Sequence, residues 1–518
     1  MLKMEDDQRS SENSFFHGVS ITFLGLVILA ISNFVLRVFL AQGLSKEEFG
    51  LFFSIFNFLG LLTILSHLGL NQSITKFVSK FRSENNPIKI KKSIISSLPI
   101  ITLLSVSIVI ILIVFSDFLA SAYFGTSQAV SILIILSFWF LFMAYHNFLT
   151  SVLQGFENFL GRTSGRIIRA ILPLSGIIFF SYLFDLEITS AAFFYLIGPI
   201  FSVIFLYLFL RRKNVDLLAK PFGKISIPMI KKMMWFGAPL ILTGISVSIV
   251  RRTDTLMLTA LRPLADVGTY QVSRVVVPLL RYFGIAIGVP LFPLVSRLWE
   301  SNERDSVGSI LSFILKYSFI LAIPLAIIVI SFPDIFIRLF FGNEYLSAVT
   351  PMRILSMAVI FSILGSITSS TLKGIDESTL VMRSSIAPAV FNIPANLILI
   401  PIYGVTGAAL ATGLSFLVGS SVGLYYSRKK IDFSFPFRSL TLASSGGFIV
   451  FLFVYLLRII ITLSIWPKFF VITISGLFLY VVWLLLTKTV TKEDLTLLKK
   501  STSLPEKIFD VLNRFTME

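Results

Sequence analysis

The sequence predicts an all-α polytopic membrane protein of about 14 transmembrane helices, arranged as two parallel six-helix repeats followed by two C-terminal helices. Three observations lead to this fold class. Only 14% of the residues are charged and 55% are hydrophobic, whereas soluble domains carry about 25% charged residues. Apolar segments follow one another from end to end, and several short motifs occur twice at nearly constant spacing. Because so few polar residues are available to form a hydrated surface, we expect the surface to face lipid.

The apolar segments are long enough to cross a hydrocarbon layer of about 30 Å. We expect spans at residues 17–41, 50–70, 93–115, 129–150, 167–184, 191–210, 233–258, 270–296, 311–331, 349–371, 383–401, 404–426, 442–464 and 467–487. The polar segment 1–14 has no basic region and no small-residue cleavage site before the first apolar run. We therefore expect a retained N-terminal tail and not a signal peptide.

Lysine and arginine gather in the even-numbered loops and at both ends of the chain. The odd-numbered loops hold only Lys46, Arg262, Arg338, Arg458 and Lys468. Because basic loops stay cytoplasmic, we expect both termini to be cytoplasmic in a multi-pass plasma-membrane protein. The net charge of +17 is then mainly a topology signal that also favours contact with anionic membrane lipids, and we expect no nucleic-acid partner.

Four pairs of short motifs recur at an offset of 217 to 219 residues. They are EFGLF at 48–52 with DVGTY at 266–270, DFLASAYFG at 117–125 with DIFIRLFFG at 334–342, LQGFE at 153–157 with LKGID at 372–376, and TSAA at 189–192 with TGAA at 406–409. Six spans are an even number, so both copies have the same orientation in the membrane. The expected division is a tail at 1–14, an N-lobe at 15–212, a linker at 213–232, a C-lobe at 233–430, two extra helices at 431–487 and a cytoplasmic tail at 488–518.

Several kinds of chemistry are excluded or disfavoured. The chain has no cysteine and only three scattered histidines, so we expect no metal site, no cofactor and no catalytic residue. A membrane glycosyltransferase or polymerase needs a positioned acid or base, and the short predicted loops contain no paired-carboxylate motif. We therefore expect a protein that is not an enzyme, and a duplicated parallel bundle favours transport through a cleft between its halves.

Seven of the basic residues inside the predicted spans are candidates for charges within the membrane. They are Arg37, Arg251, Arg252, Arg274, Arg281, Lys316 and Arg353. An arginine in the middle of a membrane helix costs about 2.5–3.5 kcal/mol on insertion scales, so the deeper ones should face protein or a watery cavity. Lys316 and Arg353 lie near the ends of their spans, where their side chains extend to the interface.

The deeper cations define the predicted site. Arg37 has Asn33 four residues earlier on the same helical face, and Arg251, Arg252 and Asp254 occupy the equivalent seventh span. Arg274 and Arg281 are seven residues apart and should share one face of the eighth span, with Pro278 between them.

The balance of charge at this site is positive, which suits an anionic group such as a phosphate or diphosphate. In the alternative interpretation, these arginines bond to carbonyl groups and stabilise kinks. Asn392 and Asn396 either line the cavity or bond between helices.

Three stretches resemble a known family. They are FGLF at 49–52, LGLNQ at 68–72 and IPIYGVTGAALATGLS at 400–415. Together with the repeat, they resemble the polysaccharide biosynthesis proteins of the multidrug/oligosaccharidyl-lipid/polysaccharide exporter superfamily. The resemblance implies two MATE-like lobes, a V-shaped cavity and a flippase that moves a lipid-linked oligosaccharide, on a polyprenyl or dolichyl diphosphate, by alternating access. It also implies that Arg37 and Arg252 match the cationic first and seventh helices of such flippases.

Two related functions remain as alternatives. A lipid II flippase carries an arginine in its second helix, whereas residues 51–70 here contain none. A drug exporter of the same superfamily has twelve spans and an acidic cavity, and Asp254 would be its ion-coupling residue. The leading interpretation is therefore an oligosaccharide flippase for cell-surface polysaccharide or glycoconjugate synthesis, with polysaccharide assembly enzymes as further partners.

Overall fold

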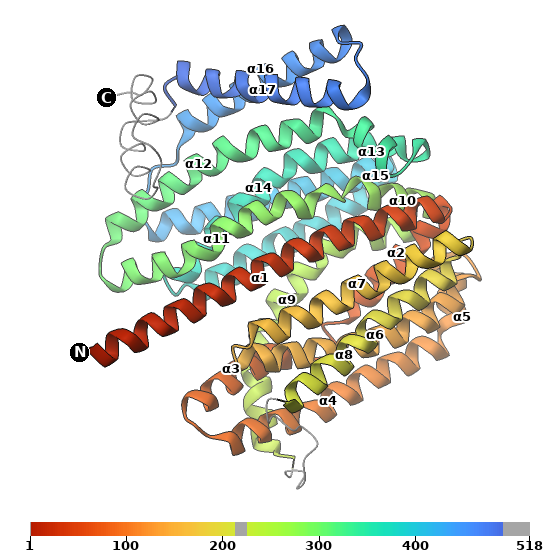
Figure 1. The fold of residues 1–518 in the computed structure, drawn as a ribbon, viewed down its shortest axis with the longest axis vertical. Coiled ribbons are helices and arrows are strands. Elements are labelled where there is room, and N and C mark those ends of the chain that lie inside the picture. Colours follow the sequence, from red (N-terminus) through yellow and green to blue (C-terminus); the bar gives the residue numbers. More distant parts are fainter. Residues whose placement is uncertain (1, 213–224, 490–518) are drawn as a thin grey trace. The chain divides into compact units, whose positions relative to one another are not determined.

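The computed structural model describes residues 2–212 and 225–489, and every regular element within these ranges is a helix (Figure 1). Most of the predicted linker at 213–232 and nearly all of the predicted tail at 488–518 lie outside the described residues. The helices up to residue 212 are α1 (Leu2–Gly43), α2 (Lys46–Leu62), α3 (Leu70–Ser83), α4 (Pro87–Val114), α5 (Ser116–Leu119), the π-helix η1 (Ala120–Phe124), α6 (Ala129–Gly155), α7 (Phe159–Leu183) and α8 (Ile188–Arg212).

The helices after residue 225 repeat this order. They are α9 (Ile227–Leu261), α10 (Leu264–Ser273), α11 (Val276–Glu300), α12 (Arg304–Ser331), α13 (Pro333–Phe340), the 3₁₀ helix η2 (Asn343–Ala348), α14 (Val349–Gly374) and α15 (Ser378–Lys430), followed by α16 (Phe437–Ile460) and α17 (Ile465–Leu486). α15 is 53 residues long and contains a non-helical residue, Gly404. This break falls between the predicted spans 383–401 and 404–426.

The backbone carries the sequence repeat. Four helices of the first copy end 217 or 218 residues before their counterparts, namely at Gly43 and Leu261, Ser83 and Glu300, Val114 and Ser331, and Arg212 and Lys430. Left-handed residues recur in the same way, with Asn85 and Asn302, Gly125 and Gly342, and Glu157 and Asp376 all at positive φ. The repeated acids at 157 and 376 therefore stand where one helix ends and the next begins, and they act as turn residues.

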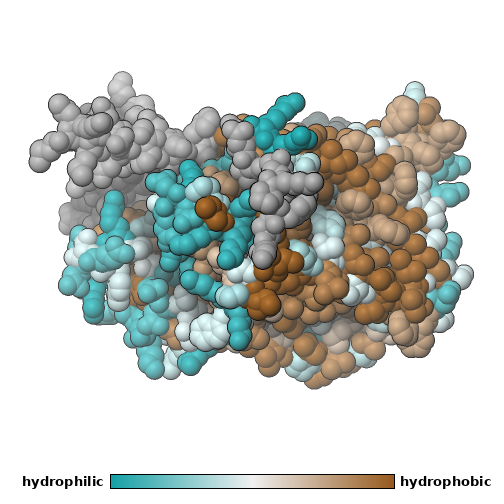
Figure 2. Space-filling view, turned by 90° about the horizontal axis from the view of Figure 1, so that it is seen from below, coloured by the Kyte–Doolittle hydropathy of each residue, from teal (hydrophilic) through white to brown (hydrophobic). Residues whose placement is uncertain are grey.

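Among the residues that the structure describes, eleven helical segments are long and apolar enough to cross a membrane. The all-α polytopic fold class is confirmed, and the count of about 14 spans stays a prediction. Large apolar side chains such as Leu103, Phe179 and Phe201 are exposed on these helices. Figure 2 shows a broad hydrophobic area on one face, with hydrophilic residues gathered to one side of it. An exposed surface of this kind suits lipid, not water.

The second predicted span is not one helix. α2 ends at Leu62, seven residues of turn follow, and α3 begins at Leu70. Leu68 and Gly69 both have positive φ, a conformation that ends a right-handed helix. The backbone N–H of Gly69 donates to Nδ1 of His67 at 3.2 Å. The continuous helix expected over 50–70 is therefore corrected to two helices joined by a turn.

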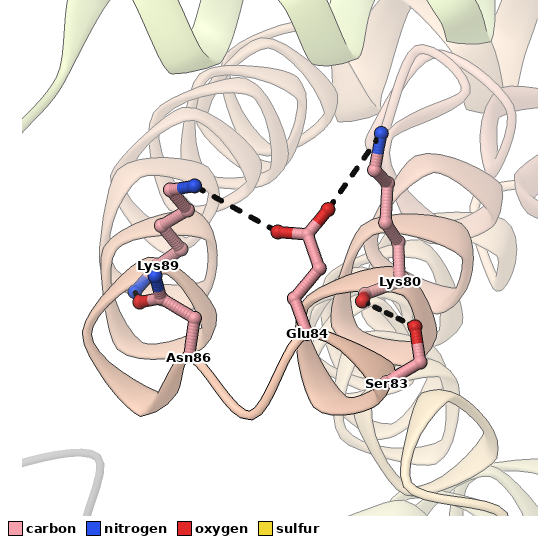
Figure 3. Close-up of polar contacts among 5 residues, drawn as sticks. All are labelled: Lys80, Ser83, Glu84, Asn86 and Lys89. Atoms are coloured by element: carbon pink, nitrogen blue, oxygen red, sulfur yellow. Dashed lines mark hydrogen bonds and ion pairs between the residues drawn. The ribbon is translucent and has the colours of Figure 1, made fainter.

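The connection between α3 and α4 shows how the basic loops are held. Glu84 bridges two lysines, with its carboxylate 3.8 Å from Nζ of Lys80 and 3.7 Å from Nζ of Lys89 (Figure 3). The Asn86 side chain accepts a hydrogen bond from the backbone N–H of Lys89 at 3.0 Å and so caps the first turn of α4.

Contacts divide the chain into two compact units, residues 1–271 and 272–518. The first unit includes α9 and most of α10, because α9 packs against α2, α3 and α4. This grouping differs from the predicted lobes, which are defined by the repeat, and the lobe boundaries stay a prediction. α14 packs against α11, α12 and α15 in the second unit, where α16 packs against α12 and α17.

Candidate functional site

The repeated EFGLF and DVGTY motifs meet in the first unit. A Cβ atom added to Gly50 would overlap the carbonyl group of Leu264, and one added to Gly268 would lie 2.5 Å from the carbonyl oxygen of Lys46. Only glycine permits so close an approach of two helix backbones. The motif glycines therefore set the crossing of α2 with α10, beside which the predicted cations lie.

Arg37 of α1 is held against this crossing. Its Nη1 donates to the backbone oxygen of Gln271 at 3.3 Å, and its guanidinium lies 4.8 Å from the centroid of the Phe53 ring. A cation over an aromatic face is stabilised most where water is excluded. Asn33, one turn earlier, is exposed, and its side-chain amide donates to the carbonyl of Leu29 at 2.7 Å.

Arg252 of α9 packs on the same face of α2. Its guanidinium fills the space that a side chain at position 60 would occupy, so Gly60 is needed to admit it. Phe53 and Gly60 are seven residues apart and therefore share one helical face. α2 thus lies beside both predicted cations, Arg37 and Arg252, whereas Arg251 is exposed.

A buried polar network adjoins these arginines. The side chain of Asp254 is buried, and its Oδ2 accepts a hydrogen bond from the Tyr270 hydroxyl at 2.6 Å. Nε2 of Gln271 donates to the Thr255 hydroxyl at 2.9 Å. These bonds fix the last turn of α10 against α9, and they position the backbone oxygen of Gln271 to which Arg37 donates.

Three further arginines form a row along α7, here called the α7 row: Arg162, Arg166 and Arg169. The intervals of four and three residues place them on one face, over about 10 Å of helix axis. Nε of Arg162 and Nε of Arg169 are buried and have no hydrogen-bond partner among the described residues. Among the described residues, no carboxylate lies within ion-pair distance of the row. The positive end of the α7 helix dipole lies at Arg162 and adds to the positive charge of the row.

The α7 row continues towards Arg37. Tyr195 of α8 interacts electrostatically with both Arg37 and Arg169, and its ring packs on Phe52 with centroids 4.9 Å apart. His146 of α6, close to Arg166 and Arg169, has Nδ1 2.8 Å from the Ser202 hydroxyl. The first unit therefore contains a line of cations from the first turn of α7 to the last two turns of α1, and such a line attracts an anion.

The α7 row was not among the predicted site residues. The expected span began at 167, which placed Arg162 and Arg166 in a loop, whereas α7 begins at Phe159. Polar and small residues in the stretch GRTSGRIIRA lower the local hydropathy and hide the helix start. The signal that could have identified the row is the spacing of four and three residues, which places the three arginines on one helical face.

The second unit holds the remaining predicted residues. Arg274 does not share a straight helix with Arg281 as expected, because a turn at 274–275 separates α10 from α11. Pro278 has no backbone N–H, so it cannot donate to the carbonyl of Arg274 one turn earlier. The guanidinium of Arg281 lies 5.9 Å from the centroid of the Phe416 ring.

Asn392 and Asn396 are fully buried in α15. Nδ2 of Asn392 donates to the Ser415 hydroxyl at 3.2 Å, across the two halves of α15. Nδ2 of Asn396 donates to the carbonyl of Asn392 at 2.9 Å. The bond to Ser415 is of the kind that the packing alternative expects, and the role of these two residues stays a prediction. Within residues 2–212 and 225–489, no group of three or more His, Asp or Glu side chains is placed to hold a metal ion.

The duplicated helical bundle and the cations in its helices are typical of membrane transporters that are built from parallel repeats. The polysaccharide biosynthesis protein family matches residues 15–299, more than half of the chain, and the MatE family matches residues 239–398. The chain belongs to the polysaccharide biosynthesis protein family, as the sequence resemblance indicated.

Similar proteins agree with this assignment. The uncharacterized membrane protein MJ1068 of Methanocaldococcus jannaschii is 26% identical, over 81% of this chain and 85% of its own length. The probable low-salt glycan biosynthesis flippase Agl15 of Haloferax volcanii is 23% identical, over 81% of this chain and 82% of its own. The structure of the lipid II flippase MurJ in an inward closed conformation matches with a TM-score of 0.73 at 18% identity, covering 89% of this chain and 97% of that one. This last likeness shows the fold, and the relatives named by function are flippases, not enzymes.

Proposed function

We propose that this protein is a flippase that moves a lipid-linked oligosaccharide, carried on a polyprenyl or dolichyl diphosphate, across the cytoplasmic membrane by alternating access. The observation that carries the proposal is the line of arginines in the first unit. The α7 row has no carboxylate partner among the described residues. Buried cations are stabilised by a paired anion. A diphosphate is such an anion, and guanidinium groups bind it through bidentate hydrogen bonds.

The chemistry of such a substrate fits the arrangement. The diphosphate would contact the α7 row and then Arg37 and Arg252, while the apolar chain stays in the bilayer. The glycan needs no covalent change, so no catalytic residue is required. The family membership and the relative named as a glycan biosynthesis flippase support this function. The charge asymmetry of the loops supports cytoplasmic termini.

The proposal is tested by reconstitution. Purified protein is placed in vesicles that contain a polyprenyl-diphosphate oligosaccharide, and a membrane-impermeant glycosidase reports how much glycan has crossed. We expect translocation of the diphosphate substrate and much slower translocation of the matching monophosphate. Absence of translocation by well-folded protein, or equal rates for the two lipids, would overturn the proposal.

Variants in the same assay test the predicted cations. Arg252→Ala and Arg281→Ala are each expected to abolish translocation and complementation while leaving the protein folded in the membrane. Full function with both residues replaced would remove them from the site. A loss of drug efflux in Asp254→Asn, with no oligosaccharide movement by the wild type, would instead support an ion-coupled exporter.

A further inference from the structure

A pocket in the second unit lies outside the proposed substrate site. It has a volume of about 340 Å³, within the range of roughly 300–1,000 Å³ typical of small-molecule sites. Its lining comes from the end of α12, the start of α13, the start of α14 and the last turns of α16: Ser331, Asp334, Arg353, Phe451, Val454, Tyr455, Arg458 and Ile459. We call it the α16 pocket.

One arginine of the α16 pocket is neutralised by the protein. Nη2 of Arg458 lies 2.6 Å from Oδ2 of Asp334, and its Nη1 donates to the backbone oxygen of Ser331. The Arg458 guanidinium also lies 5.3 Å from the centroid of the Phe332 ring. Arg458 therefore ties the end of α16 to the junction between α12 and α13, and its charge is balanced by Asp334.

The other arginine is not balanced. Arg353 is exposed, and its Nε donates to the backbone oxygen of Ile330 at 3.1 Å. No carboxylate lies within ion-pair distance of Arg353 among the described residues. Two polar atoms of the pocket lining, Oγ of Ser331 and Oδ1 of Asp334, are buried and lack a partner in the same part of the chain. The pocket thus combines one net positive charge with polar groups that need hydrogen bonds.

The residues around the pocket are of the types that gather at a membrane interface. Tyr455 and Ile459 of its wall are exposed, as is Trp466 at the start of α17, and tyrosine and tryptophan gather at membrane interfaces. The exposed face of α16 is apolar, because Phe448, Leu452 and Leu456 are also exposed along it. Arg338, Arg458 and Lys468, three of the five cations in the predicted odd-numbered loops, belong to this end of the unit.

We propose that the α16 pocket binds the phosphate of an anionic phospholipid headgroup, with Arg353 as the cationic contact and the acyl chains along the exposed face of α16. The Arg458–Asp334 pair holds the pocket wall in place, and the Ser331 hydroxyl supplies a hydrogen-bond donor close to the phosphate. A lipid fits better than a free anion, because one wall of the pocket is apolar and exposed. The site does not depend on the proposed flippase function.

The test counts bound lipids by native mass spectrometry on protein released from nanodiscs of phosphatidylcholine and phosphatidylglycerol. Wild-type protein should retain phosphatidylglycerol in preference to phosphatidylcholine. Arg353→Gln should weaken this retention about fivefold, the effect of one cation near a membrane surface. Arg338→Gln, which removes an exposed arginine of α13 that does not line the pocket, is the matched control and should resemble the wild type.

A third variant separates charge from structure. Arg353→Lys keeps the charge but changes the bond to Ile330, so it should retain the lipid nearly as well as the wild type. A loss equal to that of Arg353→Gln would assign Arg353 a structural role and overturn the proposal. The same conclusion follows if wild type shows no preference for phosphatidylglycerol, if Arg338→Gln loses as much lipid as Arg353→Gln, or if inorganic phosphate displaces the lipid at equal concentration.

Discussion

α7 and the first half of α15 occupy the same place in the two copies of the repeat, yet only α7 carries a row of cations. The first half of α15 has one cation, Arg383, and it is exposed. At the offset of 219 residues, Arg162, Arg166 and Arg169 correspond to Val381, Ser385 and Pro388. In α15, the polar residues Asn392 and Asn396 come a few residues later, and both are buried and hydrogen-bonded within α15. The duplication therefore preserves helix ends and turns, whereas the distribution of charge differs between the copies.

This difference has a functional meaning under the proposed mechanism. A transporter with two equivalent bundles needs only one strong phosphate contact, and a second contact of equal strength would hold the substrate too tightly to release it. We therefore expect α7, and not the first half of α15, to supply the main contact to the diphosphate, while the first half of α15 serves packing.

Within the comparison of α7 with α15, the largest expected effect is the loss of the α7 row. Arg166→Ala combined with Arg169→Ala should lower the rate of oligosaccharide translocation by about a hundredfold or more, because each hydrogen bond to a charged group contributes about 1.5–3 kcal/mol. The glycosidase-protection assay measures the rate. Arg211→Ala combined with Arg212→Ala, at the exposed end of α8, is the matched control and should leave it unchanged. A wild-type rate in the first variant would show that the row is structural.

The corresponding change in α15 should affect stability and not transport. Asn392→Ala removes the bond to Ser415 and should lower the free energy of unfolding by about 2 kcal/mol. Thermal unfolding in detergent measures this loss, and translocation per folded molecule should stay near the wild-type rate. A large loss of translocation with unchanged stability would place Asn392 in the substrate path and end the contrast between the two helices.

A smaller effect is expected at the contact of α2 with Arg252. Gly60→Ala places a methyl group where the guanidinium lies, so it should displace the cation and slow translocation about tenfold, the loss of one hydrogen bond to a charged group. Gly244→Ala in α9 adds a methyl group with no atom within 4 Å and is the control. Equal rates in the two variants would mean that the position of Arg252 does not matter.

The smallest effect concerns the paired arginine of the second unit. Burial raises the pKa of the Asp334 carboxyl, but the hydrogen bond and charge of Arg458 and two backbone N–H groups outweigh it and hold the pKa below its usual value. A depressed pKa gives stability that is fully present above the unfolded pKa of about 3.9 and is lost as the pH falls through the folded value. Asp334→Asn should therefore lower the melting temperature at neutral pH, by the equivalent of about 1 kcal/mol or less.

The acid arm of this experiment supplies the control. Below the folded pKa of Asp334, the wild type and Asp334→Asn should melt at the same temperature, because the wild-type carboxyl is then also neutral. A difference that persists unchanged into strong acid would assign the effect to packing. It would also remove the contrast between the neutralised Arg458 and the unpaired α7 row.

The sequence predicted the scaffold better than the site. Hydropathy located most spans, because a lipid-facing helix must be apolar over its whole length, and the motif offset revealed the duplication. Arg37 and Arg252 were predicted as site residues from their depth in apolar segments, and their role stays a prediction. The α7 row was missed because its polar surroundings resemble a loop. The prediction that Arg274 and Arg281 share one face of a straight helix was wrong, because a turn before Pro278 interrupts the eighth span.

By itself, the sequence determined that the chain is an all-helical membrane protein with two related halves and an excess of cations inside its spans. Those properties depend on composition, periodicity and repetition, which are local along the chain. Only the tertiary structure decided that Gly60 admits Arg252, that Gly50 meets α10, and that Arg37 lies over Phe53 and bonds to Gln271. These contacts join residues far apart in sequence, and the packing of whole helices, not the pattern within one, brings them together.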